Sequence, residues 1–322
     1  MRIFHQLVSP GPLPSPAARE ALQRRFKALI DQDLANVRAG LYPERLLWRT
    51  GLRDTLKVLP GGFLEVPRVI LRARRQGYDD LPPASQDPHF PGYYRRTFHW
   101  QSDGWFSERS ARMYDPGVEL LFGGTADVMR RMILPDLATA LRPLAAPRLL
   151  DVACGTGRFL DQLHTTLPHA RLTGLDLSAP YLKFARDRLA HVPDLSLVAA
   201  NAEAMPLADA SFDAVTSVFL FHELPSDARR NVLAECLRVL RPGGLLAILD
   251  STQLDDSPEL AFFLGNFPRL YHEPYYKGYS QLPLPELVRD AGFELVSDRT
   301  HFLARAVIAR RPSPAPTETS NP

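Results

Sequence analysis

The sequence predicts an α/β protein with a central, mostly parallel β-sheet and a helical region in front of it. From residue 148 onward, short apolar runs alternate with amphipathic helical patterns, which is typical of strands and helices that build a parallel sheet. Two apolar runs near the C-terminus, at about 293–298 and 302–309, are separated by only a few residues and must therefore pair as an antiparallel hairpin. Before residue 110, helical spacing is interrupted by proline.

Length and composition place the chain among soluble globular proteins. Its 322 residues suffice for one large domain or for a main domain with an appendage, and 45% of them are hydrophobic and 23% charged. No apolar run approaches the roughly 20 residues that span a bilayer, and the first residues lack the apolar core of a signal peptide. Because Cys154 and Cys236 are the only cysteines, a disulfide framework is not expected and a four-cysteine zinc site is excluded. We expect a cytoplasmic protein, and no residue is assigned to a metal.

Positive charge is concentrated at the start of the chain. Residues 1–110 carry 17 Lys or Arg against 11 Asp or Glu, although the net charge of the whole chain is only +2. This basic excess fits an anionic substrate, a membrane surface bound through the basic segment 63–75, or a solvated helical face. Since no nucleic-acid-binding motif accompanies it, we expect no nucleic acid partner.

Residues 1–110 are expected to form a helical and aromatic-rich extension that serves as a lid over the substrate. Its expected parts are a helix from Ser15-Pro16 to Gly40, helices at about 43–59 and 63–75, and an aromatic-rich loop over 79–107. The loop should be ordered and packed against the rest of the protein, because so many aromatic side chains would not remain in water.

Residues 111–310 are expected to form the main domain. Its parallel strands are expected at about 148–153, 171–176, 195–200, 213–219 and 244–250. Its helices are expected at about 157–166, 179–190, 204–209, 226–240 and 283–291, with an aromatic-rich insertion over 251–281. Ser226 can cap the fourth of these helices, and Pro242-Gly243-Gly244 ends it sharply. Residues 311–322 are expected to be a disordered tail.

The turn after the first parallel strand is the most informative stretch. The apolar run ends at Asp151, and a small-residue turn with Ala153, Gly155 and Gly157 leads into a helix. Such a turn lets the backbone pass close to a ligand, and the helix start offers free N–H groups to a nucleotide cofactor. A nicotinamide dinucleotide and S-adenosylmethionine both fit this pattern. The third glycine of the dinucleotide fingerprint is replaced by Leu160, which disfavours the nicotinamide cofactor.

Further motifs follow this turn in a fixed order. They are Asp176 at the end of the second strand, Asn201-Ala202-Glu203-Ala204-Met205-Pro206 after the third, Ser211-Phe212-Asp213-Ala214-Val215 opening the fourth, Phe221-His222-Glu223-Leu224-Pro225 after it, and Leu237-Arg238-Val239-Leu240-Arg241-Pro242-Gly243-Gly244 before the fifth. In this order and spacing the series resembles the class I S-adenosylmethionine-dependent methyltransferases, and in particular their branch of ubiquinone and menaquinone C-methyltransferases. The resemblance covers about residues 112–310.

The resemblance implies a doubly wound, seven-stranded, Rossmann-like sheet that is mostly parallel with an antiparallel last strand, and S-adenosyl-L-methionine as the cofactor. It also implies roles for individual residues in holding that cofactor. These are Asp151 for the amino group, Ala153, Gly155 and Gly157 around the methionyl moiety, Asp176 for the ribose, Leu177, Asn201 and Ala202 for the adenine, Phe219 through its main-chain carbonyl, and Tyr114 as a lid contact.

The expected reaction is methyl transfer to carbon or oxygen of a hydrophobic or aromatic small molecule. His222 follows the fourth strand and is the candidate general base, although a structural histidine would fit the same position. The candidate substrate contacts are Trp100, Trp105, His272 and Tyr276. Alternatively, the aromatic segments only hold the two regions of the chain together. A non-catalytic cofactor-binding sensor or partner subunit, and a nicotinamide-dependent oxidoreductase, are the alternatives to the methyltransferase function.

Overall fold

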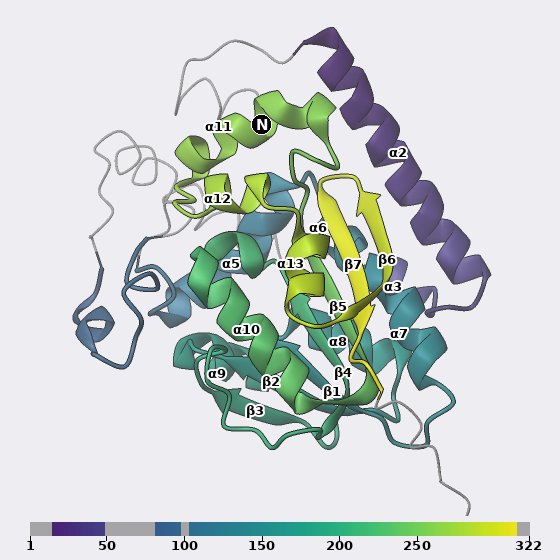
Figure 1. Cartoon of the computed structure of the whole chain (residues 1–322), viewed down its shortest axis with the longest axis vertical. Coiled ribbons are helices and arrows are strands. Elements are labelled where there is room, and N and C mark those ends of the chain that lie inside the picture. Colours follow the sequence, from purple (N-terminus) through teal and green to yellow (C-terminus); the bar gives the residue numbers. More distant parts are fainter. Residues whose placement is uncertain (1–14, 49–80, 98–102, 314–322) are drawn as a thin grey trace, which may run out of the picture.

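The structure, a computed structural model, describes residues 15–48, 81–97 and 103–313. Its centre is a seven-stranded sheet in the order β3-β2-β1-β4-β5-β7-β6 (Figure 1). The strands are β1 (Arg148–Val152), β2 (Arg171–Asp176), β3 (Ser196–Ala199), β4 (Phe212–Val218), β5 (Leu240–Ser251), β6 (Glu294–His301) and β7 (Ala304–Arg310). The first five strands pair in parallel, and β7 is antiparallel to both β5 and β6. The predicted fold class is therefore confirmed.

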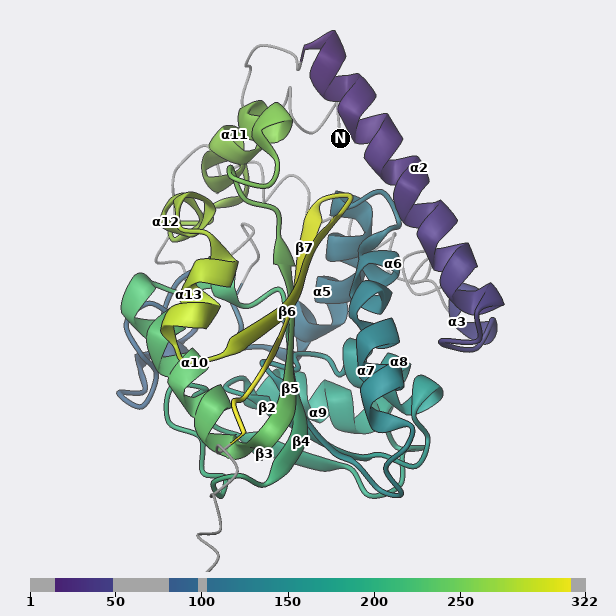
Figure 2. The same ribbon diagram turned by 45° about the vertical axis from the view of Figure 1, so that its right-hand side comes forward.

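Helices cover both faces of this sheet (Figure 2). On one face lie α7 (Leu134–Leu141), α8 (Arg158–Thr166) and α9 (Ala179–Arg188), and on the other lie α10 (Ser226–Val239) and α13 (Leu284–Asp290). Successive residues of β1 point into different cores: Leu149 packs with the α7–α9 side, whereas Leu150 and Val152 pack with the α10 side. The near-continuous apolar sequence of β1 follows from this burial on both faces.

The junction between α10 and β5 differs from the prediction. Leu240 already pairs with Phe212, and Leu245 pairs with Ala214, so the Pro-Gly-Gly turn forms a bulge inside β5. The helix therefore ends at Val239, before this turn. The predicted cap is also wrong, because Ser226 is the first residue of α10 and its hydroxyl accepts a hydrogen bond from Arg230 at 2.9 Å.

The short helix predicted over 204–209 is not formed. This segment runs as turns, and its backbone is held by side chains of α10. The Met205 amide donates to Glu235 Oε2 at 2.6 Å, and the Arg238 guanidinium donates to the carbonyl oxygens of Met205 at 3.0 Å and Leu207 at 2.7 Å. Because these partners satisfy the polar backbone groups, the segment needs no helical hydrogen bonds.

The N-terminal helix α2 (Pro16–Arg38) packs into the core of the main domain. It begins as predicted, with the Ser15 hydroxyl accepting a hydrogen bond from Ala18 N at 3.1 Å. Its Asp33 forms a bidentate ion pair with the fully buried Arg131, at 2.9 and 2.5 Å. Leu29 joins the same apolar core as Leu149 of β1. The described part of the N-terminal extension is thus continuous with the main domain.

The described part of the chain contains further helices, most of them short. They are α3 (Arg45–Trp48), η1 (Pro83–Gln86), α5 (Glu108–Leu121), α6 (Ala126–Arg130), η2 (Arg131–Ile133), η3 (Phe221–Glu223), η4 (Pro258–Leu260), α11 (Ala261–Tyr271) and α12 (Tyr276–Gln281). The insertion 251–281 is therefore largely helical. None of the described helices is long and apolar enough to cross a membrane.

Some predictions fall on residues outside the described part of the chain. Only α3 represents the helix predicted over 43–59, while the basic segment 63–75 and Trp100 lie wholly outside. Of the predicted tail, Arg311 is held in place, because its side chain donates to the Leu237 carbonyl at 3.0 Å and its amide donates to Gly244 O at 3.0 Å. Residues 314–322 are not described.

Candidate cofactor site

A cavity of about 1080 Å³, including its open mouth, lies at the carboxyl ends of β1, β2 and β4, where ligands bind in open α/β sheets. It is mostly apolar, with a few charged side chains at its inner end. The lining residues are Tyr93, Tyr94, Trp105, Tyr114, Asp115, Arg130, Asp151, Ala153, Cys154, Gly155, Thr156, Arg158, Phe159, Leu175, Asp176, Leu177, Tyr181, Ala200, Asn201, Ala202, Val218, Phe219, Leu220, Glu223, Leu224 and Val232. This set includes every residue that the sequence placed at the cofactor except Gly157.

The glycines of the turn after β1 have different tasks. Gly155 has a φ of +53°, and a Cβ there would find its nearest neighbour, Tyr181 Cδ1, only at 4.0 Å. Gly157 has a φ of +74°, and a Cβ there would lie 2.8 Å from Leu189 Cδ1 and 3.1 Å from Ala185 Cβ. Gly157 thus allows α8 to start tightly against α9, and it is not among the residues that line the cavity.

Two non-glycine residues of the cavity have left-handed backbone conformations. The φ angles are +57° at Ala153 and +58° at Phe219, which costs about 1–2 kcal/mol for a residue with a Cβ. The Phe219 amide donates to Leu249 O at 2.8 Å, and its ring stacks on Phe122 with centroids 5.7 Å apart. These contacts hold the chain at the point where β4 ends beside the cavity.

Asp176 connects β2 to the glycine turn. Its Oδ2 accepts a hydrogen bond from Gly155 N at 2.8 Å, and its Oδ1 accepts one from Ser178 N at 2.8 Å. Burial raises the pKa of Asp176, and these backbone N–H groups oppose the rise. Each carboxylate oxygen retains a second lone pair for another donor. The geometry therefore suits two neighbouring hydroxyl groups.

Asp151 lies near the end of β1, just before the turn. Its side chain is buried, and Oδ1 accepts a hydrogen bond from Thr216 Oγ1 at 2.7 Å. Burial raises the pKa of Asp151 to about 7, and the negative charge of Asp176 adds to the rise while the charge of Arg130 opposes it. A cation placed beside this carboxylate would reverse the shift and bind strongly.

A group of charged residues beside Asp151 was not anticipated from the sequence. Arg130 Nη1 lies 2.9 Å from Asp127 Oδ1, and Arg158 Nε lies 3.0 Å from the same carboxylate. Arg130 also lies 3.6 Å from Glu119 Oε1. Burial raises the pKa of Glu119 to about 7, and the charge of Asp127 adds to the rise. Because the two guanidinium groups line the cavity, this inner end can hold an anionic group.

The far side of the cavity is formed by turns that follow β2 and β3. Leu177, Asn201 and Ala202 line it, as the sequence predicted. The Asn201 side-chain oxygen accepts a hydrogen bond from Glu203 N at 3.0 Å, which fixes the turn. Glu203 in turn accepts a hydrogen bond from the Tyr93 hydroxyl at 2.6 Å, so the aromatic loop is attached to this edge of the sheet.

Aromatic side chains from the loop and from α5 cover the cavity. The rings of Trp105, Tyr114 and Tyr181 form a cluster with edge contacts, their centroids 5.4–5.7 Å apart. Ser178 donates to Trp105 O at 2.5 Å, and Asp115 of α5 accepts from Thr156 at 2.9 Å. Both predicted cover residues, Trp105 and Tyr114, therefore line the cavity. Tyr93, Tyr94 and Tyr181 join them, and only their aromatic composition signalled this in the sequence.

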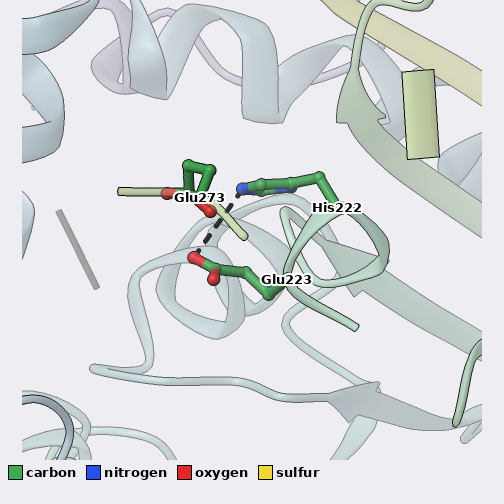
Figure 3. A group of neighbouring side chains, drawn as sticks. All are labelled: His222, Glu223 and Glu273. Carbon is green, nitrogen blue, oxygen red and sulfur yellow. Dashed lines mark ion pairs between the residues drawn. The ribbon is translucent and has the colours of Figure 1, made fainter. Parts of the chain in front are cut away.

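His222 belongs to a buried acidic cluster at the wall of the cavity (Figure 3). Its Nδ1 lies 2.6 Å from Asp250 Oδ1, and its Nε2 lies 3.8 Å from Glu223 Oε1. The negative charge of Asp250 raises the pKa of His222 against the opposing effect of burial. Burial and the neighbouring Glu223 raise the pKa of Glu273 well above its usual range. The sequence indicated neither Asp250 nor Glu273 as part of this group.

Two of the candidate substrate contacts do not reach the cavity. Tyr276 is 1% exposed and packs among Leu260 and Leu264, and its hydroxyl is 2.6 Å from Ser251 Oγ. His272 is also buried and does not line the cavity. Tyr276 shares a small apolar core with Phe263 and Phe267, so the structure places neither of these two predicted substrate contacts at the cavity.

The comparisons with known proteins agree with this geometry. Residues 149–244 match a family model described as a methyltransferase domain. The chain is 32% identical over 213 residues to demethylmenaquinone methyltransferase of Thermotoga maritima, covering 61% of this chain and 89% of that protein. It is 42% identical over 155 residues to phthiotriol/phenolphthiotriol dimycocerosates methyltransferase 1 of Mycobacterium ulcerans, covering 48% of this chain and 56% of that protein.

Two further proteins are similar to this chain. The chain is 39% identical over 150 residues to the ubiquinone/menaquinone biosynthesis C-methyltransferase UbiE of Methylobacterium nodulans, covering 45% of this chain and 57% of that protein. Among solved structures, a SAM-dependent methyltransferase of Methanosarcina mazei aligns with a TM-score of 0.45 at 20% identity, covering 56% of this chain and 98% of that one. By its sequence relatives, the chain belongs to the class I S-adenosylmethionine-dependent methyltransferases.

Proposed function

We propose that this methyltransferase transfers the methyl group of S-adenosylmethionine to carbon or oxygen of a hydrophobic small molecule bound in the same cavity. The observation that carries the proposal is a single cavity that joins a nucleotide-binding sheet edge to an aromatic cover. An apolar cavity with a few convergent polar groups is typical of small-molecule sites. The relatives are named for acting on quinones and on phthiotriol lipids, which are hydrophobic acceptors.

The amino-acid end of the cofactor would occupy the charged inner end of the cavity. Asp151 would pair with the ammonium group, next to the small side chain of Ala153 and the bare backbone of Gly155. Arg130, with Arg158 behind it, would hold the carboxylate, because a guanidinium binds a carboxylate through two parallel hydrogen bonds. The ammonium and the carboxylate group of the cofactor would thus each face a side chain of opposite charge.

The nucleoside end would extend toward the turns after β2 and β3. Asp176 would accept hydrogen bonds from the two ribose hydroxyls through the lone pairs left free by the backbone. Leu177 and Ala202 would lie on the faces of the adenine, and Asn201 would recognise its edge. Tyr114 would close over the sulfonium, and a dry aromatic surface strengthens the attraction between a ring face and this cation.

The chemistry requires little of the protein beyond alignment and exclusion of water. The acceptor's electron pair forms the new bond to the methyl carbon, while the carbon–sulfur bond breaks and its electron pair stays on sulfur. The positive sulfonium becomes a neutral thioether, and a hydroxyl or carbon acid then loses one proton to a base. His222 could serve as that base through Nε2, as long as the lone pair of this nitrogen is not bound to a metal ion.

The test measures binding and turnover separately. Titration calorimetry should show one binding site for S-adenosylhomocysteine. Asp176→Ala should lower the affinity for this ligand, while the melting temperature of the variant stays close to that of the wild type. Incubating small-molecule extracts with enzyme and deuteromethyl S-adenosylmethionine should produce a hydrophobic product heavier by one deuteromethyl group. Cofactor binding without transfer to any acceptor would instead indicate a sensor or partner subunit and overturn the proposal.

A further inference from the structure

His222 and Glu223 meet Glu273, which is distant in the chain, beside the wall of the cavity. His222 and Glu223 belong to η3, and Glu273 lies in the turn between α11 and α12. One ring nitrogen of His222 and one carboxylate oxygen from each glutamate lie within 4.8 Å of one another (Figure 3). His222 is 6% exposed and Glu273 is fully buried. Three side chains of metal-ligating type therefore converge in a place that water hardly reaches.

The second observation is the orientation of His222. Asp250 is fully buried, and its oxygens accept hydrogen bonds from Phe221 N at 2.6 Å and Ser251 N at 2.7 Å. The hydrogen bond of 2.6 Å between Asp250 and His222 Nδ1 therefore assigns the ring proton to Nδ1. Nε2 then carries a lone pair directed at the glutamates, and its 3.8 Å separation from Glu223 Oε1 exceeds a hydrogen bond.

This arrangement matches the ordinary chemistry of metal-binding histidines. Such a histidine presents one ring nitrogen to the ion and donates from the other to a carboxylate, which fixes its tautomer. Two neighbouring ligand atoms bound to one ion at about 2.0–2.2 Å lie about 3–3.6 Å apart, and the Nε2–Oε1 distance of 3.8 Å exceeds this by a few tenths of an ångström, which a small side-chain rotation would close. One imidazole and two carboxylates suit a divalent transition metal, whose charge the two carboxylates balance in a buried site.

We propose that His222, Glu223 and Glu273 bind a divalent transition-metal cation, such as Mn²⁺ or Zn²⁺, beside the cofactor. Glu223 lines the cavity, so the open coordination positions face the space left for the methyl acceptor. The cation would hold the acceptor through an oxygen atom, as a Lewis acid does with a phenol or an enol. This role rests on the proposed function and narrows the acceptor to molecules with such an oxygen. His222 is then a ligand and not the general base.

The test uses the metal alone. Mn²⁺ is titrated into the metal-stripped full-length protein, and free Mn²⁺ is followed by its electron paramagnetic resonance signal, with Zn²⁺ as competitor. We expect one site per chain in the wild type, and an affinity at least about tenfold lower in His222→Gln and in Glu273→Gln. His191→Gln is the matched control, because His191 Nε2 also lies near a carboxylate, 3.1 Å from Asp161, but neither residue lines the cavity. It should keep the site.

Folding and cofactor binding are measured on the same samples. Glu223→Gln is the second variant, since Glu223 is less buried than Glu273, and thermal melting identifies any variant that has lost its fold. A wild type without a site for either cation, or a site kept in folded Glu223→Gln and Glu273→Gln, would overturn the proposal. If S-adenosylhomocysteine binds and the cations do not, only this inference fails. If the cations bind and S-adenosylhomocysteine does not, the proposed function fails.

Discussion

Cofactor affinity should fall as the pH falls through neutrality, because Asp151 has to be ionised to hold an ammonium group. The pKa of Asp151 is about 7 in the cofactor-free protein. About 76% of this carboxyl is then ionised at pH 7.5 and about 9% at pH 6.0. If only the ionised form binds, the affinity for S-adenosylhomocysteine should be about eightfold lower at pH 6.0. Binding at pH 6.0 should also release about one proton.

Titration calorimetry checks both quantities, with buffers of different ionisation enthalpy reporting the released proton. Glu119 titrates in the same range and lies beside Arg130, so two controls isolate Asp151. Asp151→Asn should bind weakly with no such pH dependence. The ligand 5′-methylthioadenosine lacks the amino-acid part and should bind the wild type equally at both pH values. Equal affinity of the wild type for S-adenosylhomocysteine at pH 6.0 and 7.5 would refute the reasoning.

The raised pKa of Asp151 also predicts how the stability of the cofactor-free protein depends on pH. Stability should fall over the pH range in which cofactor binding improves. A carboxyl whose pKa is raised by folding stabilises the protein below its unfolded pKa, and this stabilisation is lost as the pH rises through about 7. At pH 8 the cofactor-free protein therefore buries an ionised Asp151. Asp151→Asn removes that charge and should raise the melting temperature at pH 8, with a smaller gain at pH 5. A lower melting temperature at pH 8 would contradict the assignment.

The remaining predictions concern packing and ion pairs. Gly157→Ala should destabilise the protein by about 2–3 kcal/mol in urea unfolding, because the new methyl group would lie 2.8 Å from a side chain near the end of α9. Gly155→Ala should cost only about 1 kcal/mol, because its left-handed backbone is strained but its surroundings are open. Arg130→Lys should weaken S-adenosylhomocysteine binding about tenfold and leave 5′-methylthioadenosine unaffected in calorimetry. Arg131→Met should lower the free energy of unfolding in urea by about 3–5 kcal/mol, because it leaves the carboxylate of Asp33 buried without this partner. The double variant, with Asp33→Leu added, should recover most of the lost stability.

The residues that line the cavity at the strand ends could be predicted from the sequence because their determinants are local. Asp151 and Asp176 stand at the ends of apolar runs, and strand ends of a parallel sheet meet at one edge. Gly155 follows within a few residues and is needed there for its left-handed backbone. Each of these signals lies within one strand-turn unit. Gly157 belongs to the same unit, but a tight helix contact selects glycine just as a close ligand contact does, so the sequence alone does not say which of the two it serves.

The charged inner end and the His222 cluster could not be predicted, because they join residues that are far apart in the chain. Arg130 reaches Arg158 only through the shared carboxylate of Asp127. Glu273 meets His222 only after α11 and α12 have folded over the strand ends. An isolated arginine or glutamate in a sequence carries no sign of such a partner. Aromatic residues are ambiguous for a related reason: Tyr276 fills a core while Trp105 lines the cavity, and composition alone does not separate the two.

We expect acceptor specificity to depend on segments that lie outside the matched methyltransferase domain. The matched methyltransferase domain covers 149–244 and contains Asp151 and Asp176, the residues that we propose for the methyl donor. Two residues that we propose near the acceptor lie outside it: Trp105, which lines the cavity, comes before this region, and Glu273, which lies beside His222 and Glu223, comes after it. Both segments are attached to the domain by specific contacts, such as the hydrogen bond from Ser178 to the Trp105 carbonyl. Acceptor specificity should therefore change with substitutions in these flanking segments while donor affinity stays constant.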